Sequence, residues 1–231
     1  MPPSGLKLSE MIMSKETQRI EAFSDGVFAI AITLLILEIH VPTIQPNTTL
    51  VHSLLHEWAS FLAFFIGFLT LLICWINHHY MFTRITKSNS TLLLLNGFKL
   101  LVVTITPFAT ALLAKNIRSV WRDSSISIYC FNFTLMGLAM TLIWFYAKRM
   151  GFINIRNKDE LIVASRLYGF ATILSATIWL VSYISIFASL ILFCIMFMIY
   201  GFPERIVRLQ LRRMKKEPSS EVQLKTDLQE T

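Results

Sequence analysis

The feature that most constrains this chain is a series of apolar runs as long as a lipid bilayer is thick. A helix needs about 20 mostly apolar residues to cross the hydrocarbon core. The last run, roughly 162–202, is about twice that length, which predicts two helices joined by a turn near Val181–Ser185. The sequence therefore predicts an all-α membrane protein with six transmembrane helices. The predicted spans are roughly 20–40, 56–82, 91–114, 125–148 and the two halves of 162–202.

Charge is scarce and is confined to the ends of these runs. Only 15% of the 231 residues are charged, against about 25% in a typical soluble domain. Basic residues beside apolar runs contact the membrane surface and set orientation, so a nucleic-acid partner is not expected. These flanking basic residues include Lys148, Arg149, Arg205, Arg208, Arg212 and Arg213.

Lysine and arginine in the connections predict the orientation. The connection 41–55 has no Lys or Arg, whereas the next one carries Arg84 and Lys87. The connection with Lys115 and Arg118 is the exception to this alternation. Because cytoplasmic loops are enriched in basic residues, both termini are expected in the cytoplasm. The predicted domains are a cytoplasmic segment 1–18, a six-helix transmembrane domain 19–203 and a basic, mobile cytoplasmic tail 204–231.

The first predicted helix is unusually polar at its start. Arg19, Glu21 and Asp25 lie within two turns of one another, and Gly26 follows them. Ionisable groups in a membrane helix are costly and usually face protein or water. Two interpretations remain open, which are interfacial charges that snorkel and a polar network that holds this helix at a functional interface.

The second predicted helix carries adjacent histidines, His78 and His79, which cannot share one helix face. A metal site with Asp25 or Glu38 is conceivable, but the spacings HxxxH and ExxH are absent. We therefore expect hydrogen-bonded histidines, no metal and no cofactor. Lys99 in the third predicted helix either snorkels to the interface or pairs with an acidic residue.

The motif Arg19-xxx-Phe23-Ser24-Asp25-Gly26 resembles the RxxxFSDG-type signature of the transmembrane protein 175 family. This is a family of potassium channels of prokaryotes and of endosomes and lysosomes. The resemblance includes the pattern Trp75-xx-His78-His79 and Asn96, and it thins after about residue 115.

The resemblance implies a homotetramer of six-helix chains in which the first helix lines a central pore. The permeant species would be potassium and other monovalent cations, in the plasma membrane of a prokaryote. The TVGYG filter of ordinary potassium channels is absent from the sequence. The resemblance places the first constriction at Ile30, five residues after the motif aspartate.

Helix geometry places the expected pore residues along one stripe of the first helix. At about 100° per residue, Leu34 and Leu37 fall within roughly 40° of Ile30, and Thr33 falls about 60° from it. Asp25 points away from this stripe, whereas Phe23 and Arg19 lie near it. We expect Ile30, Thr33, Leu34 and Leu37 to line the pore, and Arg19, Phe23, Ser24, Asp25, Gly26, Trp75, His78, His79 and Asn96 to form a motif and bracing network.

Two other classes of function remain open at this point. One is a secondary transporter or proton-coupled carrier, which often shows broken helices and inverted repeats; this short sequence shows neither. The other is a membrane metalloenzyme that uses His78, His79 and nearby acids. The favoured reading is a channel rather than an enzyme.

Overall fold

The computed structural model describes residues 5–39, 41, 49–155 and 157–212, so the end of the predicted tail lies outside it. The described residues are helical apart from turns and one isolated bridge. The elements are α1 (Gly5–Leu34), its 3-10 extension η1 (Leu35–Glu38), α2 (Leu50–His56), α3 (Trp58–Phe82), α4 (Ser90–Asn116), α5 (Arg122–Arg149), α6 (Lys158–Ser182) and α7 (Ile186–Tyr200). A further helix, Pro203–Arg212, is called the C-terminal helix below.

Five helices are long and apolar enough to cross a membrane, which confirms most of the predicted spans. A sixth span is counted only if α7 and the C-terminal helix are taken together, and these two are bent by 76°. At about 1.5 Å per residue, the 15 residues of α7 fall short of a hydrocarbon core of about 30 Å. α7 ends at Tyr200, two residues before the predicted end of the last span, and Pro203 begins the next helix, where its fixed φ is well suited.

Polar side chains determine where several helices begin. The side chains of Thr49, Asn89, Asn157 and Ser185 each accept a hydrogen bond from a backbone N–H in the first turn of the following helix. Such caps satisfy donors that the helix itself leaves unpaired. The cap at Thr49 explains α2, a short helix within a connection that we did not expect to be helical.

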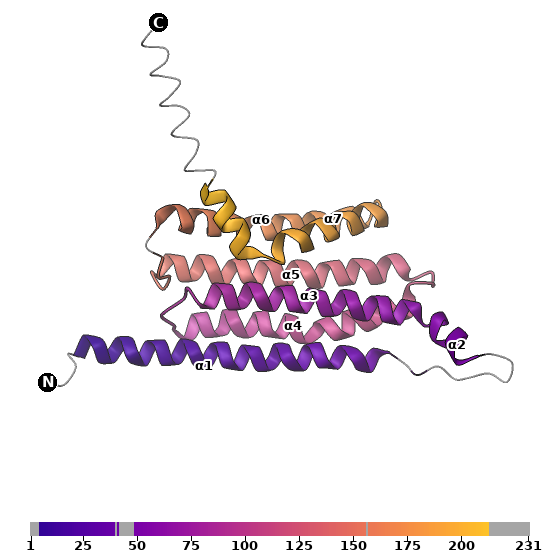
Figure 1. The fold of residues 1–231 in the computed structure, drawn as a ribbon, viewed down its shortest axis with the longest axis horizontal. Coiled ribbons are helices and arrows are strands. Elements are labelled where there is room, and N and C mark those ends of the chain that lie inside the picture. The colour runs from indigo at the N-terminus through magenta and orange to yellow at the C-terminus, as the bar shows by residue number, and fades with distance from the viewer. Residues whose placement is uncertain (1–4, 40, 42–48, 156, 213–231) are drawn as a thin grey trace, which may run out of the picture.

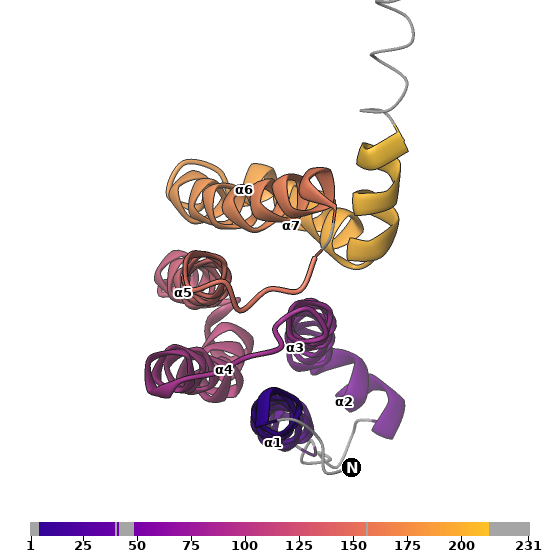
Figure 2. The ribbon, with the colours of Figure 1, turned by 90° about the vertical axis from the view of Figure 1, so that its left-hand side faces the viewer.

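The spanning helices run antiparallel to their chain neighbours, as Figure 1 shows. Seen end-on in Figure 2, α1 lies at one edge beside α3 and α4, whereas α6 and α7 lie on the opposite side of α5. One apolar cluster joins α1 to α3 and α4 through Phe28, Leu35, Leu71 and Val103. α1 is therefore an edge helix with one covered side.

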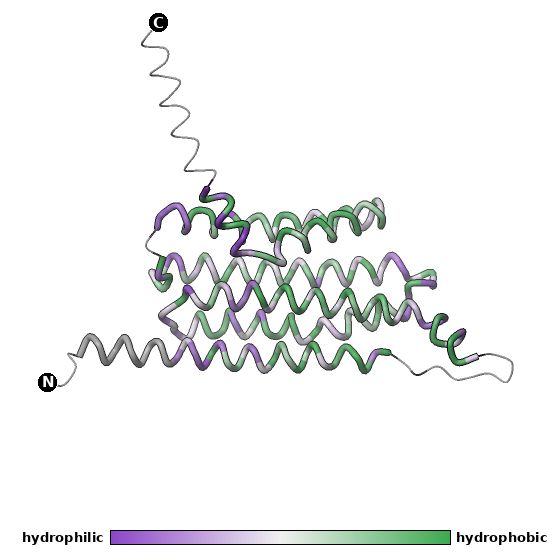
Figure 3. Tube along the Cα trace, in the orientation of Figure 1, coloured by the Kyte–Doolittle hydropathy of each residue, from purple (hydrophilic) through white to green (hydrophobic). Residues whose placement is uncertain are grey.

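One end of the bundle collects the N-terminal half of α1 and two connections. Thr86 N–H donates to Phe152 O at 2.9 Å, and Asn154 N–H donates to Arg84 O at 2.9 Å, so the two connections lie side by side. Arg84 also pairs with Glu160 at 3.3 Å. In Figure 3, the hydrophilic segments gather at the helix ends and in the connections, and the hydrophobic colour dominates between them.

Gly67 lies where α3 closely approaches α4. A Cβ at Gly67 would lie 2.8 Å from Thr110 Oγ1 and 3.1 Å from Leu35 Cδ2. We expect Gly67→Ala to destabilise the chain by about 1–3 kcal/mol because the helices must move apart. Gly169→Ala is the matched control, since a Cβ there meets no atom within 4 Å and alanine favours the helix. Thermal unfolding in detergent distinguishes the two, and an unchanged midpoint for Gly67→Ala would contradict the close packing.

Candidate functional site: the first helix and its polar contacts

α1 has one covered face and one open face. On the covered face, Ser24, Phe28, Ala31 and Leu35 are each at most 1% exposed. These positions are separated by three or four residues, which is the spacing of one helix face. The sequence thus divides the helix into a side that packs on α3 and α4 and a side that the chain leaves uncovered.

The predicted pore-lining residues all lie on the open face. Ile30 is 61% exposed, Leu34 43% and Leu37 70%. Thr33 is also exposed, and its hydroxyl donates to Ile30 O of the same helix at 2.9 Å. Towards the N-terminus the same face continues with exposed residues of the motif, which are Arg19, Phe23 and Gly26.

A buried chain of hydrogen bonds joins α1, α4 and α3. His78 Nε2 lies 3.0 Å from Asn96 Oδ1, and Asn96 Nδ2 donates to Ser24 Oγ at 2.9 Å. Ser24 Oγ donates in turn to Ile20 O at 2.7 Å. Because Asn96 Oδ1 can only accept, His78 must carry its proton on Nε2. All three side chains are at most 3% exposed, so water does not compete for these bonds.

Two further contacts connect α1 to α3 beside this chain. Trp75 Nε1 donates to Asp25 Oδ1 at 2.8 Å, and His79 Nδ1 lies 2.8 Å from Glu21 Oε1. Glu21 and Asp25 are four residues apart on α1, and Trp75 and His79 are four residues apart on α3. Because the two helices are antiparallel, the two contacts lie one helical turn apart. The rings of Trp75 and His79 also stack, with centroids 6.0 Å apart. The structure thus gives His78 and His79 different partners.

Arg19 and Lys99 behave differently from the other charged groups. Among the described residues Arg19 has no ion pair, so it is not joined to Asp25. Lys99 is fully buried, and its Nζ lies 4.5 Å from the centroid of the Phe28 ring without a hydrogen-bond partner in the described part of the chain. It therefore does not snorkel, and its charge is held against an aromatic face of α1.

Glu21 is the contact residue that the motif comparison did not single out. Its signal in the sequence is its position four residues before Asp25, which matches the position of His79 four residues after Trp75. Within the described residues, no group of three His, Cys, Asp or Glu side chains is arranged to hold a metal ion. The histidines are engaged by Asn96 and Glu21 instead.

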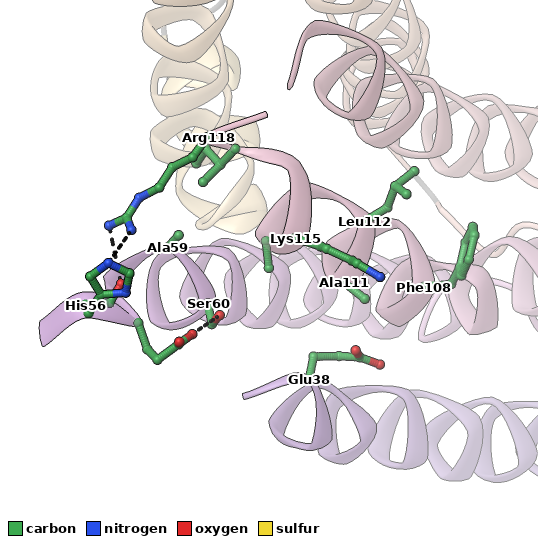
Figure 4. Close-up of a pocket in the computed structure, with 12 residues that line it drawn as sticks. Glu38, His56, Ala59, Ser60, Phe108, Ala111, Leu112, Lys115 and Arg118 are labelled. Carbon is green, nitrogen blue, oxygen red and sulfur yellow. Dashed lines mark hydrogen bonds between the residues drawn. The ribbon is translucent and has the colours of Figure 1, made fainter. Parts of the chain in front are cut away.

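At the opposite end of α1, Glu38 lines a pocket of about 640 Å³ between η1, α3 and α4. In Figure 4, Glu38 faces the side that carries Lys115 and Phe108, while Arg118 extends to His56. Arg118 donates to His56 O at 3.3 Å. The pocket therefore mixes acidic and basic groups, and the basic ones partly offset the field of Glu38.

The indole contact with Asp25 has a direct test. We expect Trp75→Phe to lower stability by about 1–3 kcal/mol, because a half-buried carboxylate loses a charge-assisted hydrogen bond. Trp58→Phe serves as a control for loss of an exposed indole at the opposite end of α3. Thermal unfolding of both variants measures the difference, and equal midpoints would show that the Asp25 contact adds nothing.

Comparison with known proteins gives a consistent result. A family model described as endosomal/lysosomal potassium channel TMEM175 matches residues 19–107, which contain both motifs and the polar contacts. A potassium channel of Chamaesiphon minutus is 38% identical over 178 residues, covering 75% of this chain and 88% of that protein. A potassium channel of Streptomyces collinus is 41% identical over 138 residues, covering 59% and 66%.

A solved structure has the same fold. The crystal structure of a lysosomal potassium-selective channel TMEM175 homolog from Chamaesiphon minutus superposes with a TM-score of 0.73 at 35% identity. The match covers 82% of this chain and 98% of that one. By sequence and by fold, the chain belongs to the TMEM175 family.

Proposed function

We propose that this chain is the subunit of a potassium-permeable channel. The observation that carries the proposal is the open face of α1, which continues from Arg19 past Thr33 to Leu37 and contains polar as well as apolar side chains. The similar proteins from Chamaesiphon minutus and Streptomyces collinus are named potassium channels. The family is described as a channel, so the metalloenzyme reading is set aside and the chain is not an enzyme.

The pore requires several copies of the chain. α1 lies at the edge of a single bundle, as Figure 2 shows, so one chain cannot enclose a path along its open face. We propose a homotetramer in the lipid bilayer, with four copies of α1 around a central axis. The transmembrane domain 19–203 would form the channel, and 204–231 would be a cytoplasmic extension that begins with the C-terminal helix.

The proposed constriction is a ring of four Ile30 side chains. Apolar rings close a pore by steric block and by expelling water, and Leu34 and Leu37 would add further rings. The Thr33 hydroxyls would lie between the Ile30 and Leu34 rings and would offer oxygen to a passing cation. Opening would require the α1 helices to rotate or splay, while Glu38 attracts monovalent cations at the outer mouth.

The proposed orientation places both termini in the cytoplasm of a prokaryotic cell, with the chain in the plasma membrane. Its support is the basic end of the bundle, where Arg84, Lys148 and Lys158 lie near the connections that pair through Ile85 and Ile153. Protease accessibility of tags added at each terminus in right-side-out vesicles measures this directly. Cleavage from the outside at either end would contradict it.

Flux through purified protein tests the function. In liposomes with opposed potassium and sodium gradients, we expect passive potassium flux that does not saturate at low millimolar concentration, and no flux in protein-free liposomes. Native mass measurement of the same preparation is expected to give four copies of a 26.6 kDa chain. A saturable turnover site would favour the transporter reading, and another stoichiometry would contradict the tetramer.

A further inference from the structure

α7 ends against the side of α3, at Asn77, rather than level with the end of α3. Its last residue, Tyr200, lies against Asn77, which stands five residues before Phe82 at the end of α3. The end of a helix leaves carbonyl groups without intrahelical donors, and irregular backbone within a membrane is tolerated only where protein or water satisfies it. The chain must therefore supply polar groups at this depth.

Asn77 supplies part of them. Its Nδ2 donates to Tyr200 O at 2.8 Å and to Ile73 O at 2.8 Å. Because both amide hydrogens point to carbonyl oxygens, the orientation of the amide is fixed, and Oδ1 must face the other way as an acceptor. Asn77 Oδ1 is buried and has no hydrogen-bond partner among the described residues.

Another residue that lines the same pocket as Asn77 carries a second buried polar atom. Tyr168 on α6 is 2% exposed, and its hydroxyl also lacks a partner in the described part of the chain. Asn77 and Tyr168 both line one pocket of about 60 Å³, with Tyr200 and apolar side chains such as Ile73 and Met196. An unsatisfied buried polar group costs free energy comparable to a lost hydrogen bond, and two such groups on residues that line one pocket point to a shared partner.

We propose that this pocket holds internal water that bridges α3 and α6 at the end of α7. One water molecule donates to Asn77 Oδ1 and accepts from the Tyr168 hydroxyl. The volume exceeds the roughly 10–15 Å³ that one water needs, and buried waters typically have two to four polar partners. The site is separate from the open face of α1 and does not depend on the proposed pore. The water would lie beside the break between α7 and the C-terminal helix.

The sign of a stability change tests the proposal. Tyr168→Phe removes only the hydroxyl. If water is bound, the water loses a partner, and the unfolding midpoint is expected to fall by about 2–4 °C. If the pocket is dry, removing an unsatisfied hydroxyl leaves the midpoint unchanged or raises it, which overturns the proposal. Tyr129→Phe gives the size of the change expected when a buried tyrosine loses one hydrogen bond, because the Tyr129 hydroxyl lies 2.7 Å from Thr70 Oγ1.

Filling the pocket should reverse the effect of Tyr168→Phe on the unfolding midpoint. Ala171 lines the pocket and follows Tyr168 by three residues on α6, so Ala171→Val adds two methyl groups on the same helix face. In this background, where water is displaced, Tyr168→Phe is expected to raise the midpoint instead of lowering it. The same sign in both backgrounds would overturn the proposal.

A high-resolution map of the protein in lipid nanodiscs identifies the occupant. We expect density within hydrogen-bond distance of Asn77 Oδ1 and the Tyr168 hydroxyl, and no density there in Ala171→Val. An empty pocket would overturn the proposal. In crystals of the protein soaked with thallium, anomalous diffraction signal at this position would also overturn it, since it would show a monovalent cation in place of water.

Discussion

Replacing Ile30 by asparagine is expected to raise potassium flux through reconstituted protein by about tenfold or more. An apolar ring excludes water from a narrow pore, and a polar side chain of similar size allows the ring to stay wet. A tenfold change corresponds to removing about 1.4 kcal/mol from the barrier to permeation. The measurement is the initial rate of potassium flux in liposomes at matched protein density.

The control for this result is the same substitution at an exposed position far from the open face of α1. Ile173 on α6 is 65% exposed, and α6 lies on the other side of α5 from α1, as Figure 2 shows. Ile173→Asn is expected to leave the flux of correctly folded protein unchanged. Unchanged flux in Ile30→Asn, with folding intact, would show that Ile30 is not the constriction.

Replacing Asn96 by leucine is expected to have the largest effect on stability. The substitution leaves His78 Nε2 buried without its partner and removes the donor to Ser24 Oγ, which keeps only its bond to Ile20 O. An unsatisfied buried group costs about 1–3 kcal/mol and a lost hydrogen bond about 0.5–1.5 kcal/mol, so we expect a loss of about 2–4 kcal/mol. Thermal unfolding in detergent should show a midpoint lower by roughly 5–15 °C.

Thr104→Leu is the matched control on the same helix. Thr104 is exposed, and its hydroxyl donates only to Leu101 O within α4. A leucine there is expected to change the midpoint by little. If Asn96→Leu unfolds at the same temperature as the unmodified protein, the buried chain does not stabilise the packing of α1 and α4.

The spans could be predicted from the sequence because run length and turn position are local properties. The predicted turn near Val181–Ser185 separates α6 from α7 as expected. The early end of α7 could not be predicted in this way, because it depends on Asn77, more than 120 residues earlier in the chain. Apolar composition continues through Tyr200 and Phe202, so the length of the apolar run alone does not mark the break.

The contacts of α1 were partly predictable. Helix geometry indicated that Asp25 points away from the expected pore face, and the adjacent histidines predicted separate partners. The identity of each partner required the register of α1 against α3. That register pairs Asp25 with Trp75 and Glu21 with His79, and it leaves Arg19 outside the network. The burial of Lys99 also depends on tertiary packing, because sequence position alone allows both orientations.

The uneven distribution of polar contacts along α1 has a mechanical consequence. The hydrogen bonds described above between α1 and its neighbouring helices lie between Glu21 and Asp25, whereas η1 is wound as a 3-10 helix and Leu35 packs in an apolar cluster. Hydrogen bonds depend on direction and resist rotation, whereas dispersion contacts depend mainly on distance. α1 is therefore held by directional bonds near its polar end and by apolar packing around Leu35. A small tilt about the polar end would displace Leu37 more than Ile30, because Leu37 lies farther along the helix.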